Sequence, residues 1–173
     1  CEVNHLLLRN DTEETQDLSL NSYVEFCFWN AVDDSTNFQR NLSLGEVEVI
    51  GSTIYHKTEY RERRNHYAYY TVNTDIDGFD TDRDAFLGDY GSIENPKAVR
   101  EGISCQSIAS GGAVIGSHHL KLTLAPGETR SLIFLLGYAE NPADEKWEAP
   151  DIINKTPAFD TIFWLNTDEK IAD

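Results

Sequence analysis

The sequence predicts an all-β fold, a sandwich of large antiparallel sheets with few and short helices. Along several segments apolar and polar side chains alternate, which is the period of a strand with one buried face. The segment "HHLKLTLAPGETRSLIFLLGY" contains a strand on each side of Pro126 and Gly127. Proline fixes φ and glycine accepts a positive φ, so this pair predicts a hairpin turn.

Three other segments predict strands. In "LSLNSYVEFCFW" the residues expected on one face are Leu18, Leu20, Val24, Phe26 and Phe28, with Ser19, Asn21, Glu25 and Cys27 on the other. In "GEVEVIGSTIY" two glutamates, Glu46 and Glu48, alternate with Val47 and Val49. The segment "HYAYYTVN" is rich in aromatic and β-branched residues, which suit a pleated surface.

Helix signals are confined to three places. Asn95 and Pro96 are expected as the N-cap and first residue of a helix that stops at Gly102. "AVDDSTNFQRN" has room for one helical turn between strands. Thr167 is expected to cap a helix at the end of the chain, which we interpret as the start of a longer one. The chain begins at Cys1 and has no methionine, which suggests a segment of a longer protein.

Composition excludes several classes of partner. The chain has 173 residues and a formal net charge of −16, which repels nucleic-acid phosphates and anionic lipids. No apolar run approaches the roughly 20 residues of a membrane span, and no signal peptide is recognisable. We therefore expect neither a nucleic acid nor a membrane as partner. Cys1, Cys27 and Cys105 have no zinc spacing, and their odd number favours a reducing compartment, with Cys27 as a small core residue.

The acidic stretch "NTDIDGFDTDRDAF" resembles the register of an EF-hand calcium loop. Oxygen-bearing residues fall at positions one, three, five, nine and twelve of that loop, and glycine falls at position six; they are Asn73, Asp75, Asp77, Thr81, Asp84 and Gly78. The context argues against calcium, because a strand-like segment precedes the stretch and a glycine-containing segment follows it. Position eight, normally apolar, is Asp80, and position twelve is one methylene shorter than glutamate.

Two interpretations of this stretch remain. The first is a solvated acidic loop between strands. In the second, Arg83 lies among Asp80, Asp82 and Asp84, and one of these carboxylates holds its guanidinium in a fixed orientation after a turn at Gly78. A fixed planar guanidinium beside carboxylates is well suited to hydrogen-bonding sugar hydroxyls.

Basic and histidine residues give weaker signals. Lys57, Arg61, Arg63 and Arg64 lie within eight residues, interrupted by glutamates; we favour ion pairing over an anion or sugar-acid site. Adjacent His118 and His119 face opposite sides of a strand, so they cannot share a metal; we expect His118 in the core. The sequence shows no nucleophile with a visible base and no metal-ligand spacing. We predict no metal site. A glycosidase-like pair of carboxylates stays open at this point, because the chain has many Asp and Glu residues and none is singled out by an apolar pocket signature.

Four blocks occur in the order found in one enzyme family: "FWNAVDDSTNFQRNLSLGEVEV", "STIYHKTEYRERRNHYAYY", "GFDTDRDAFLGDYGSIENP" and "IGSHHLKLTLAPGETRSLIFLLGY". Together they resemble the N-terminal domain of the cellobiose phosphorylases, inverting glycoside phosphorylases of glycoside hydrolase family 94. The resemblance runs from about Val3 to about Pro142. It implies a β-supersandwich that forms part of a larger sandwich domain, over residues 1–142, with residues 143–173 starting a linker to a helical barrel.

The resemblance also implies a function. Full-length enzymes of this kind convert cellobiose and phosphate to glucose 1-phosphate and glucose, without metal or organic cofactor. Their catalytic acid and most phosphate ligands belong to an (α/α)6 barrel, so this segment is expected to be non-catalytic. The sandwich contributes an arginine to the acceptor-sugar site, and Arg83 is the matching residue. A cytoplasmic homodimer is expected for the full-length enzyme. The alternative is a freestanding carbohydrate-binding β-sandwich.

Overall fold

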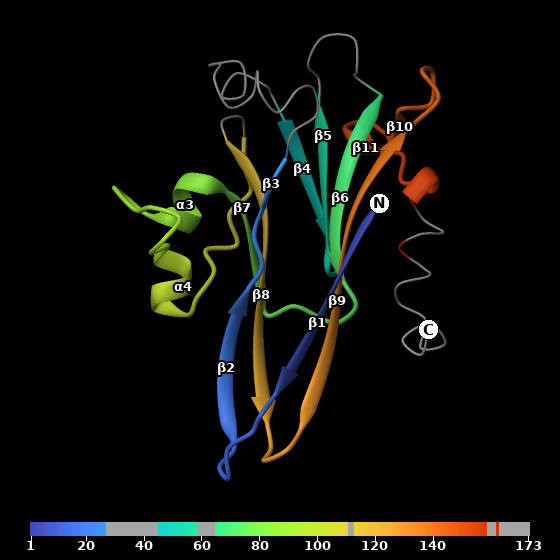
Figure 1. Ribbon diagram of the computed structural model, residues 1–173. Helices are drawn as coiled ribbons and strands as arrows, with labels where there is room; N and C mark the ends of the chain where they lie inside the picture. The colour runs from blue at the N-terminus through green and yellow to red at the C-terminus, as the bar shows by residue number, and fades with distance from the viewer. Residues whose placement is uncertain (27–44, 59–64, 111–112, 159–161, 163–173) are drawn as a thin grey trace.

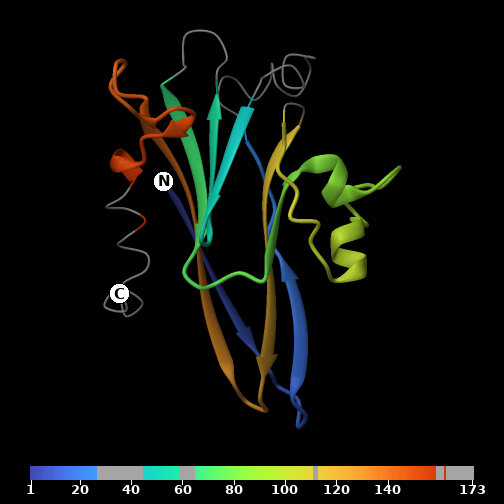
Figure 2. The ribbon, with the colours of Figure 1, turned by 180° about the vertical axis from the view of Figure 1, so that it is seen from behind.

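The computed structural model describes residues 1–26, 45–58, 65–110, 113–158 and 162 of the 173 in the chain. Two antiparallel sheets face one another, with two short helices beside one sheet and a small two-stranded sheet beside the other (Figures 1 and 2). The predicted all-β class is therefore confirmed. The turn expected in residues 31–41, the C-terminal helix at Thr167, and the core position of Cys27 lie outside the described residues.

The larger sheet has five antiparallel strands in the order β1-β9-β6-β5-β4. Its members are β1 (Glu2–Arg9), β9 (Thr129–Glu140), β6 (His66–Val72), β5 (Thr53–Thr58) and β4 (Gly45–Ile50). The expected strand from Gly45 to Tyr55 is instead a hairpin, since Gly51 has φ +57° and reverses the chain between β4 and β5. Alternation alone did not reveal this turn.

The smaller sheet is built around β8 (Val114–Leu124). One edge of β8 pairs with β2 (Gln16–Asn21) and β3 (Val24–Glu25), and the other pairs with β7 (Gly78–Asp82). The single strand expected from Leu18 onward is interrupted at Ser22 and Tyr23, but β2 and β3 keep one register along β8. The Ser22 side chain explains the interruption, because its Oγ accepts a hydrogen bond from the His118 N–H at 3.0 Å.

The predicted turn forms at Pro126 and Gly127, but the prediction of a hairpin is wrong, because β8 and β9 belong to different sheets and do not pair with each other. Gly127 has φ +73°, and the Glu128 N–H donates to the Ala125 carbonyl at 3.0 Å, which closes the turn. Asn10, between β1 and β2, ties this connection to the turn between β8 and β9. Its backbone N–H donates to Glu128 O, and its side-chain amide donates to Leu124 O at 2.9 Å.

Aromatic and aliphatic side chains from both sheets fill the space between them. The buried members of this core are Phe26, Ala68, Tyr70, Val72, Ala109, Val114, Leu120, Leu132 and Phe134. His118 lies here as predicted, fully buried, with its ring centroid 4.7 Å from that of Tyr70. His119 faces the other way, and its Nε2 hydrogen-bonds Ser19 Oγ at 2.8 Å.

The outer face of the larger sheet is covered by residues after Glu140. Strands β10 (Trp147–Ala149) and β11 (Ile152–Ile153) pair with each other, and Ile153 and Ala158 are buried against the tyrosines of β5 and β6. Residues 143–158 therefore pack on the sandwich in this structure. The boundary at Pro142 and a linker beyond it stay a prediction.

Helices α3 (Arg83–Leu87) and α4 (Lys97–Glu101) lie beside the sheet that contains β7 and β8 (Figure 1). The start predicted for α4 is wrong by one residue. Pro96 has ψ 142° and is the N-cap rather than the first helical residue, and Gly102, with φ +62°, ends the helix as expected. Within the described part of the chain, neither helix is long or apolar enough to cross a membrane.

Candidate functional site

Arg83 lies where β7 changes into α3. Asp82 is the last residue of β7 and the N-cap of α3, and its Oδ1 accepts hydrogen bonds from the N–H groups of Asp84 and Ala85 at 2.8 and 3.1 Å. The Arg83 N–H donates to the Ala113 carbonyl at 3.2 Å. The change from strand to capped helix thus places Arg83 at the edge of the sheet.

A turn at Gly78, expected to lift Arg83 out of the sheet, is not what the structure shows. Gly78 is the first residue of β7 and pairs with His119. A side chain there would meet Ser104, since a Cβ on Gly78 would lie 1.9 Å from Ser104 Oγ. Close packing, rather than a bend, is the reason for this glycine.

The carboxylate that holds Arg83 comes from β3. Arg83 Nε donates to Glu25 Oε1 at 3.1 Å, and the Tyr23 hydroxyl donates to the same oxygen at 2.5 Å. The side chains of Arg83 and Glu25 are 36% and 31% exposed, so the pair borders solvent. The expectation that Asp82 or Asp84 pairs with the guanidinium is wrong for Asp82, because its carboxylate caps α3.

The surroundings fix the protonation states of Tyr23 and Arg83. Burial and, to a smaller extent, the hydrogen bond to Glu25 together raise the pKa of Tyr23 to about 12. Burial alone would lower the pKa of Arg83, but hydrogen bonds with Glu25 and Tyr23 raise it. Tyr23 therefore remains a donor and Arg83 a cation, and the Tyr23 ring is packed 5.2 Å from that of Phe86 on α3.

Two of the side chains that suggested a calcium loop, Asn73 and Asp77, bind backbone N–H groups instead. Asn73 Oδ1 accepts from the Ile133 N–H at 2.8 Å, and Asp77 Oδ2 accepts from the Lys121 N–H at 2.6 Å. Asp80 is 1% exposed and accepts from the N–H groups of Cys105 and Ser107 and from Ser107 Oγ. The stretch runs through strand β7 and helix α3, not between two helices. Among described residues no group of three His, Cys, Asp or Glu side chains is placed to hold a metal.

Asp80 also fixes the chain around Arg83. Its carboxylate binds residues 105 and 107, while Thr81 Oγ1 donates to the Ser107 carbonyl at 2.8 Å and accepts from the Ala109 N–H at 2.9 Å. These bonds attach the segment after α4 to β7. Buried carboxylates satisfied by several N–H groups are stable anchors, so the residues that precede Arg83 are held firmly.

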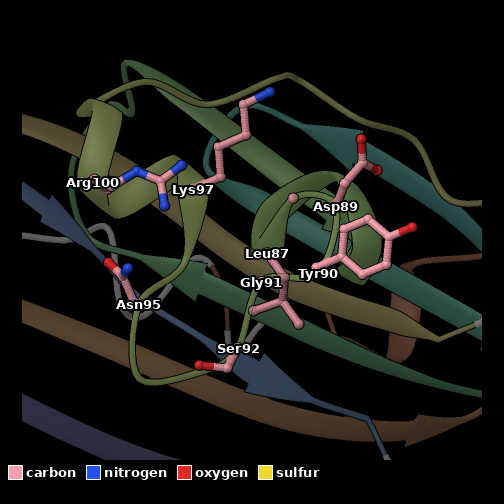
Figure 3. A pocket seen from close by; sticks show the side chains of 9 residues that line it. Leu87, Asp89, Tyr90, Gly91, Ser92, Asn95, Lys97 and Arg100 are labelled. Carbon is pink, nitrogen blue, oxygen red and sulfur yellow. The ribbon is translucent and has the colours of Figure 1, made fainter.

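Two surface hollows lie beside Arg83. The larger has a volume of about 570 Å³ and is lined by Arg83, Asp84, Leu87, Gly88, Asp89, Tyr90 and Gly91. The smaller, about 370 Å³, shares the last five of these residues and adds Ser92, Asn95, Lys97 and Arg100 (Figure 3). Small-molecule sites commonly have volumes of ~300–1,000 Å³.

Sequence reasoning missed Glu25, Tyr23 and Tyr90 as neighbours of Arg83. The alternation that put Glu25 on the polar face of its strand also puts Tyr23 there, but nothing local links either residue to Arg83. Of the basic cluster, Arg61, Arg63 and Arg64 lie outside the described residues. Lys57 pairs with Glu46 and Glu48 at 2.9 and 3.0 Å, which supports the ion-pairing interpretation.

Comparison with known proteins identifies the family to which this architecture belongs. The model of the glycosyl hydrolase 94 supersandwich domain matches residues 1–156. An N,N'-diacetylchitobiose phosphorylase of Vibrio proteolyticus is 31% identical over 168 residues, which cover 94% of this chain and 20% of that protein. One of Vibrio furnissii is 30% identical over 142 residues, 80% of this chain and 17% of that protein. The chain spans about a fifth of the length of these curated relatives. It belongs to the glycosyl hydrolase 94 family, in which residues 1–156 correspond to the supersandwich domain.

Proposed function

We propose that this chain is the acceptor-binding part of a disaccharide phosphorylase, with Arg83 hydrogen-bonding the acceptor sugar. The observation that carries the proposal is the setting of Arg83. It is held through Nε by Glu25, borders solvent, and lines a hollow of about 570 Å³ in a supersandwich domain of this family. Because Glu25 engages Nε, the outer edge of the guanidinium is oriented before a ligand arrives, which reduces the cost of ordering it.

The proposed reaction is an inverting phosphorolysis. A carboxylic acid protonates the glycosidic oxygen while a phosphate oxygen attacks the anomeric carbon from the opposite face. A β-linked disaccharide is thereby converted to an α-sugar 1-phosphate and a free reducing sugar. In this proposal both the acid and the phosphate site belong to a helical barrel outside these 173 residues. The net charge of −16 fits that division, since it opposes binding of phosphate to this part.

Two substrates are candidates. The sequence blocks resemble the cellobiose phosphorylases, whereas both reported relatives are N,N'-diacetylchitobiose phosphorylases. Each disaccharide is β-linked and presents equatorial hydroxyls that a guanidinium can hydrogen-bond. We propose cellobiose phosphorolysis as the first candidate and diacetylchitobiose phosphorolysis as the second.

The test uses the full-length protein that contains this chain. Incubation with phosphate and either cellobiose or N,N'-diacetylchitobiose should release one sugar 1-phosphate, whose α-configuration can be read by NMR. The isolated 173-residue chain should release none. Absence of any sugar phosphate from both disaccharides, in a folded full-length protein, would show that the proposal is wrong.

The wider assembly is also proposed. We expect a homodimer of full-length chains, which light scattering coupled to gel filtration would detect as twice the chain mass. We further propose a cytoplasmic location, supported by the exposed free thiols of Cys1 and Cys105. Fractionation of the source cells would test the location.

A further inference from the structure

Tyr90 is a large aromatic side chain with no packing partner among the described residues. Its relative exposure is 108%, higher than that of any other exposed large hydrophobic residue described. Aromatic side chains contribute mainly through the surface they bury, so a fully exposed tyrosine contributes little to the stability of the fold. The position therefore needs another explanation.

The backbone at Tyr90 makes this placement costly. Residues 88–91 form a turn closed by a hydrogen bond of 2.9 Å from the Gly91 N–H to the Gly88 carbonyl. Tyr90 is the third residue of the turn and has φ +59°, a value that normally selects glycine or asparagine. An unfavourable backbone that persists without a packing gain points to a function of the side chain.

The glycines on either side give the loop its shape. Gly88 has φ +81°, and a Cβ there would lie 2.8 Å from Lys97 Cβ. A Cβ on Gly91 would lie 2.1 Å from the Leu87 carbonyl oxygen. The turn is thus closely packed on α3 and α4 at both ends, while Tyr90 between them projects outward (Figure 3).

Tyr90 shares the larger hollow with the charged groups expected of a sugar site. Arg83, Asp84 and Asp89 line that hollow together with Tyr90. A guanidinium and carboxylates hydrogen-bond sugar hydroxyls, and the negative face of an aromatic ring attracts the C–H groups on the apolar face of a pyranose. The charged groups and the aromatic ring would therefore contact different parts of the same sugar ring.

We propose that Tyr90 is a stacking platform for the pyranose ring of the saccharide bound at Arg83. The inference rests on the proposed sugar-binding function and adds to it a residue in the turn that follows α3. The phenol ring would cover the apolar face of the sugar, while Arg83 and the carboxylates contact its hydroxyls. The strained turn then serves to present the ring without side-chain neighbours that compete for its faces.

The test compares Tyr90→Gly and Tyr90→Phe in the full-length protein. Tyr90→Gly removes the ring and suits the positive φ, so we expect Tm to be unchanged or slightly higher. It should raise KM for the disaccharide about three- to tenfold and leave KM for phosphate unchanged. Tyr90→Phe keeps the stacking face and should retain the wild-type KM. Tyr138→Ala is the matched control, because Tyr138 is 49% exposed on β9 of the other sheet.

The outcomes separate this inference from the role of Arg83. Unchanged disaccharide KM in Tyr90→Gly, with a raised KM in Arg83→Ala, would overturn the stacking proposal alone. A raised disaccharide KM in Tyr90→Gly, with an unchanged KM in Arg83→Ala, would support stacking and overturn the role of Arg83. If Tyr90→Gly changes the mass of the assembly in solution or lowers Tm, and KM stays normal, then Tyr90 is a protein contact instead.

The full-length protein could also prove inactive on both disaccharides. Calorimetric titration with cellobiose and with N,N'-diacetylchitobiose then decides the question. Binding to the wild type that weakens in Tyr90→Gly and not in Tyr90→Phe supports the platform. No binding of either sugar, or equal binding by both variants, overturns it.

Discussion

Arg83 and Glu25 are 58 residues apart in the sequence, and Arg83 Nε donates to Glu25 Oε1 at 3.1 Å. Strand β8 brings them together, since Glu25 pairs with Ile115 on one edge of β8 and Asp82, which precedes Arg83, pairs with Val114 on the other. The pair therefore spans the width of one strand. The Tyr23 hydroxyl on the same Glu25 oxygen limits how that carboxylate can turn.

If Glu25 acts by positioning Arg83, a change at Glu25 should affect sugar binding only when Arg83 is present. We expect Glu25→Gln to raise the disaccharide KM of the full-length enzyme up to about fivefold, because a partly exposed ion pair contributes ~0.2–1 kcal/mol. In an Arg83→Ala background the same change should have no further effect. Steady-state kinetics of the four proteins measure this coupling. Equal effects of Glu25→Gln in both backgrounds would contradict the positioning role.

Arg83→Ala tests the proposed sugar contact directly. Loss of hydrogen bonds from a charged group costs about 1.5–3 kcal/mol, so we expect KM for the disaccharide, and for the acceptor sugar in synthesis, to rise roughly ten- to a hundredfold. KM for phosphate should change little. Arg83→Lys should recover only part of the loss, because an ammonium cannot reproduce the planar fork. If Arg83 only stabilises its own loop, Tm will fall while the sugar kinetics stay at wild-type values.

Lys57 joins residues 146–158 to the larger sheet. Its side chain is 3% exposed, pairs with Glu46 and Glu48, and donates to the Asp151 carbonyl. Its Nζ also lies 4.6 Å from the centre of the Trp147 ring.

Lys57→Met keeps the volume and removes the charge. We expect a loss of about 1–3 kcal/mol in the free energy of unfolding, since the Asp151 carbonyl loses its donor and Glu48 keeps, among the described residues, only Lys155 as a cationic partner. Urea unfolding measures the loss, and limited proteolysis should show faster cleavage within residues 146–158. Arg9→Ala, which removes the exposed ion pair with Asp11, is the control and should cost under about 1 kcal/mol. A similar loss in both variants would contradict the role of Lys57 in holding residues 146–158 on the larger sheet.

His56 and His118 predict a loss of stability in mild acid. Burial lowers the pKa of His56 to about 3 and that of His118 to about 4, whereas both titrate near 6.5 in the unfolded chain. Below pH 6.5 the unfolded state binds protons that the folded state does not. The stabilisation is therefore complete above pH 6.5 and is lost as the pH falls toward 4 and then 3. Each histidine should contribute a slope of about 1.4 kcal/mol per pH unit in this range.

The variant His118→Leu separates the contribution of one ring. It should lower stability at pH 7.5, because the hydrogen bond between His118 Nδ1 and Ser22 Oγ is lost, yet reduce the slope between pH 6.5 and 5 by up to about 1.4 kcal/mol per pH unit. Urea midpoints at several pH values measure the slope. Val3→Ala, an exposed change on β1 that removes no titratable group, should keep the wild-type slope. An unchanged slope in His118→Leu would show that another group governs the acid transition.

The sequence by itself determined the elements whose causes are local. Alternating residues specified β2, β4 and the second half of β8, Pro126 and Gly127 specified the β8–β9 turn, and Gly102 specified the end of α4. Each of these depends on a residue's own φ preference or on the two-residue period of a strand. The order of four sequence blocks also indicated the family, which the match over residues 1–156 confirmed.

Only the tertiary structure decided which groups meet. Asp82 and Asp84 are next to Arg83 in sequence, but Asp82 satisfies the helix N-terminus and Glu25 binds the guanidinium. The hairpin at Gly51 likewise became apparent only through pairing of β4 with β5 and β5 with β6. Register and partner choice depend on long-range packing and hydrogen bonding among strands, which no local window of sequence contains. For the same reason, the placement of Tyr90 beside Arg83 emerged from the fold of the α3–α4 turn and not from either residue's neighbours.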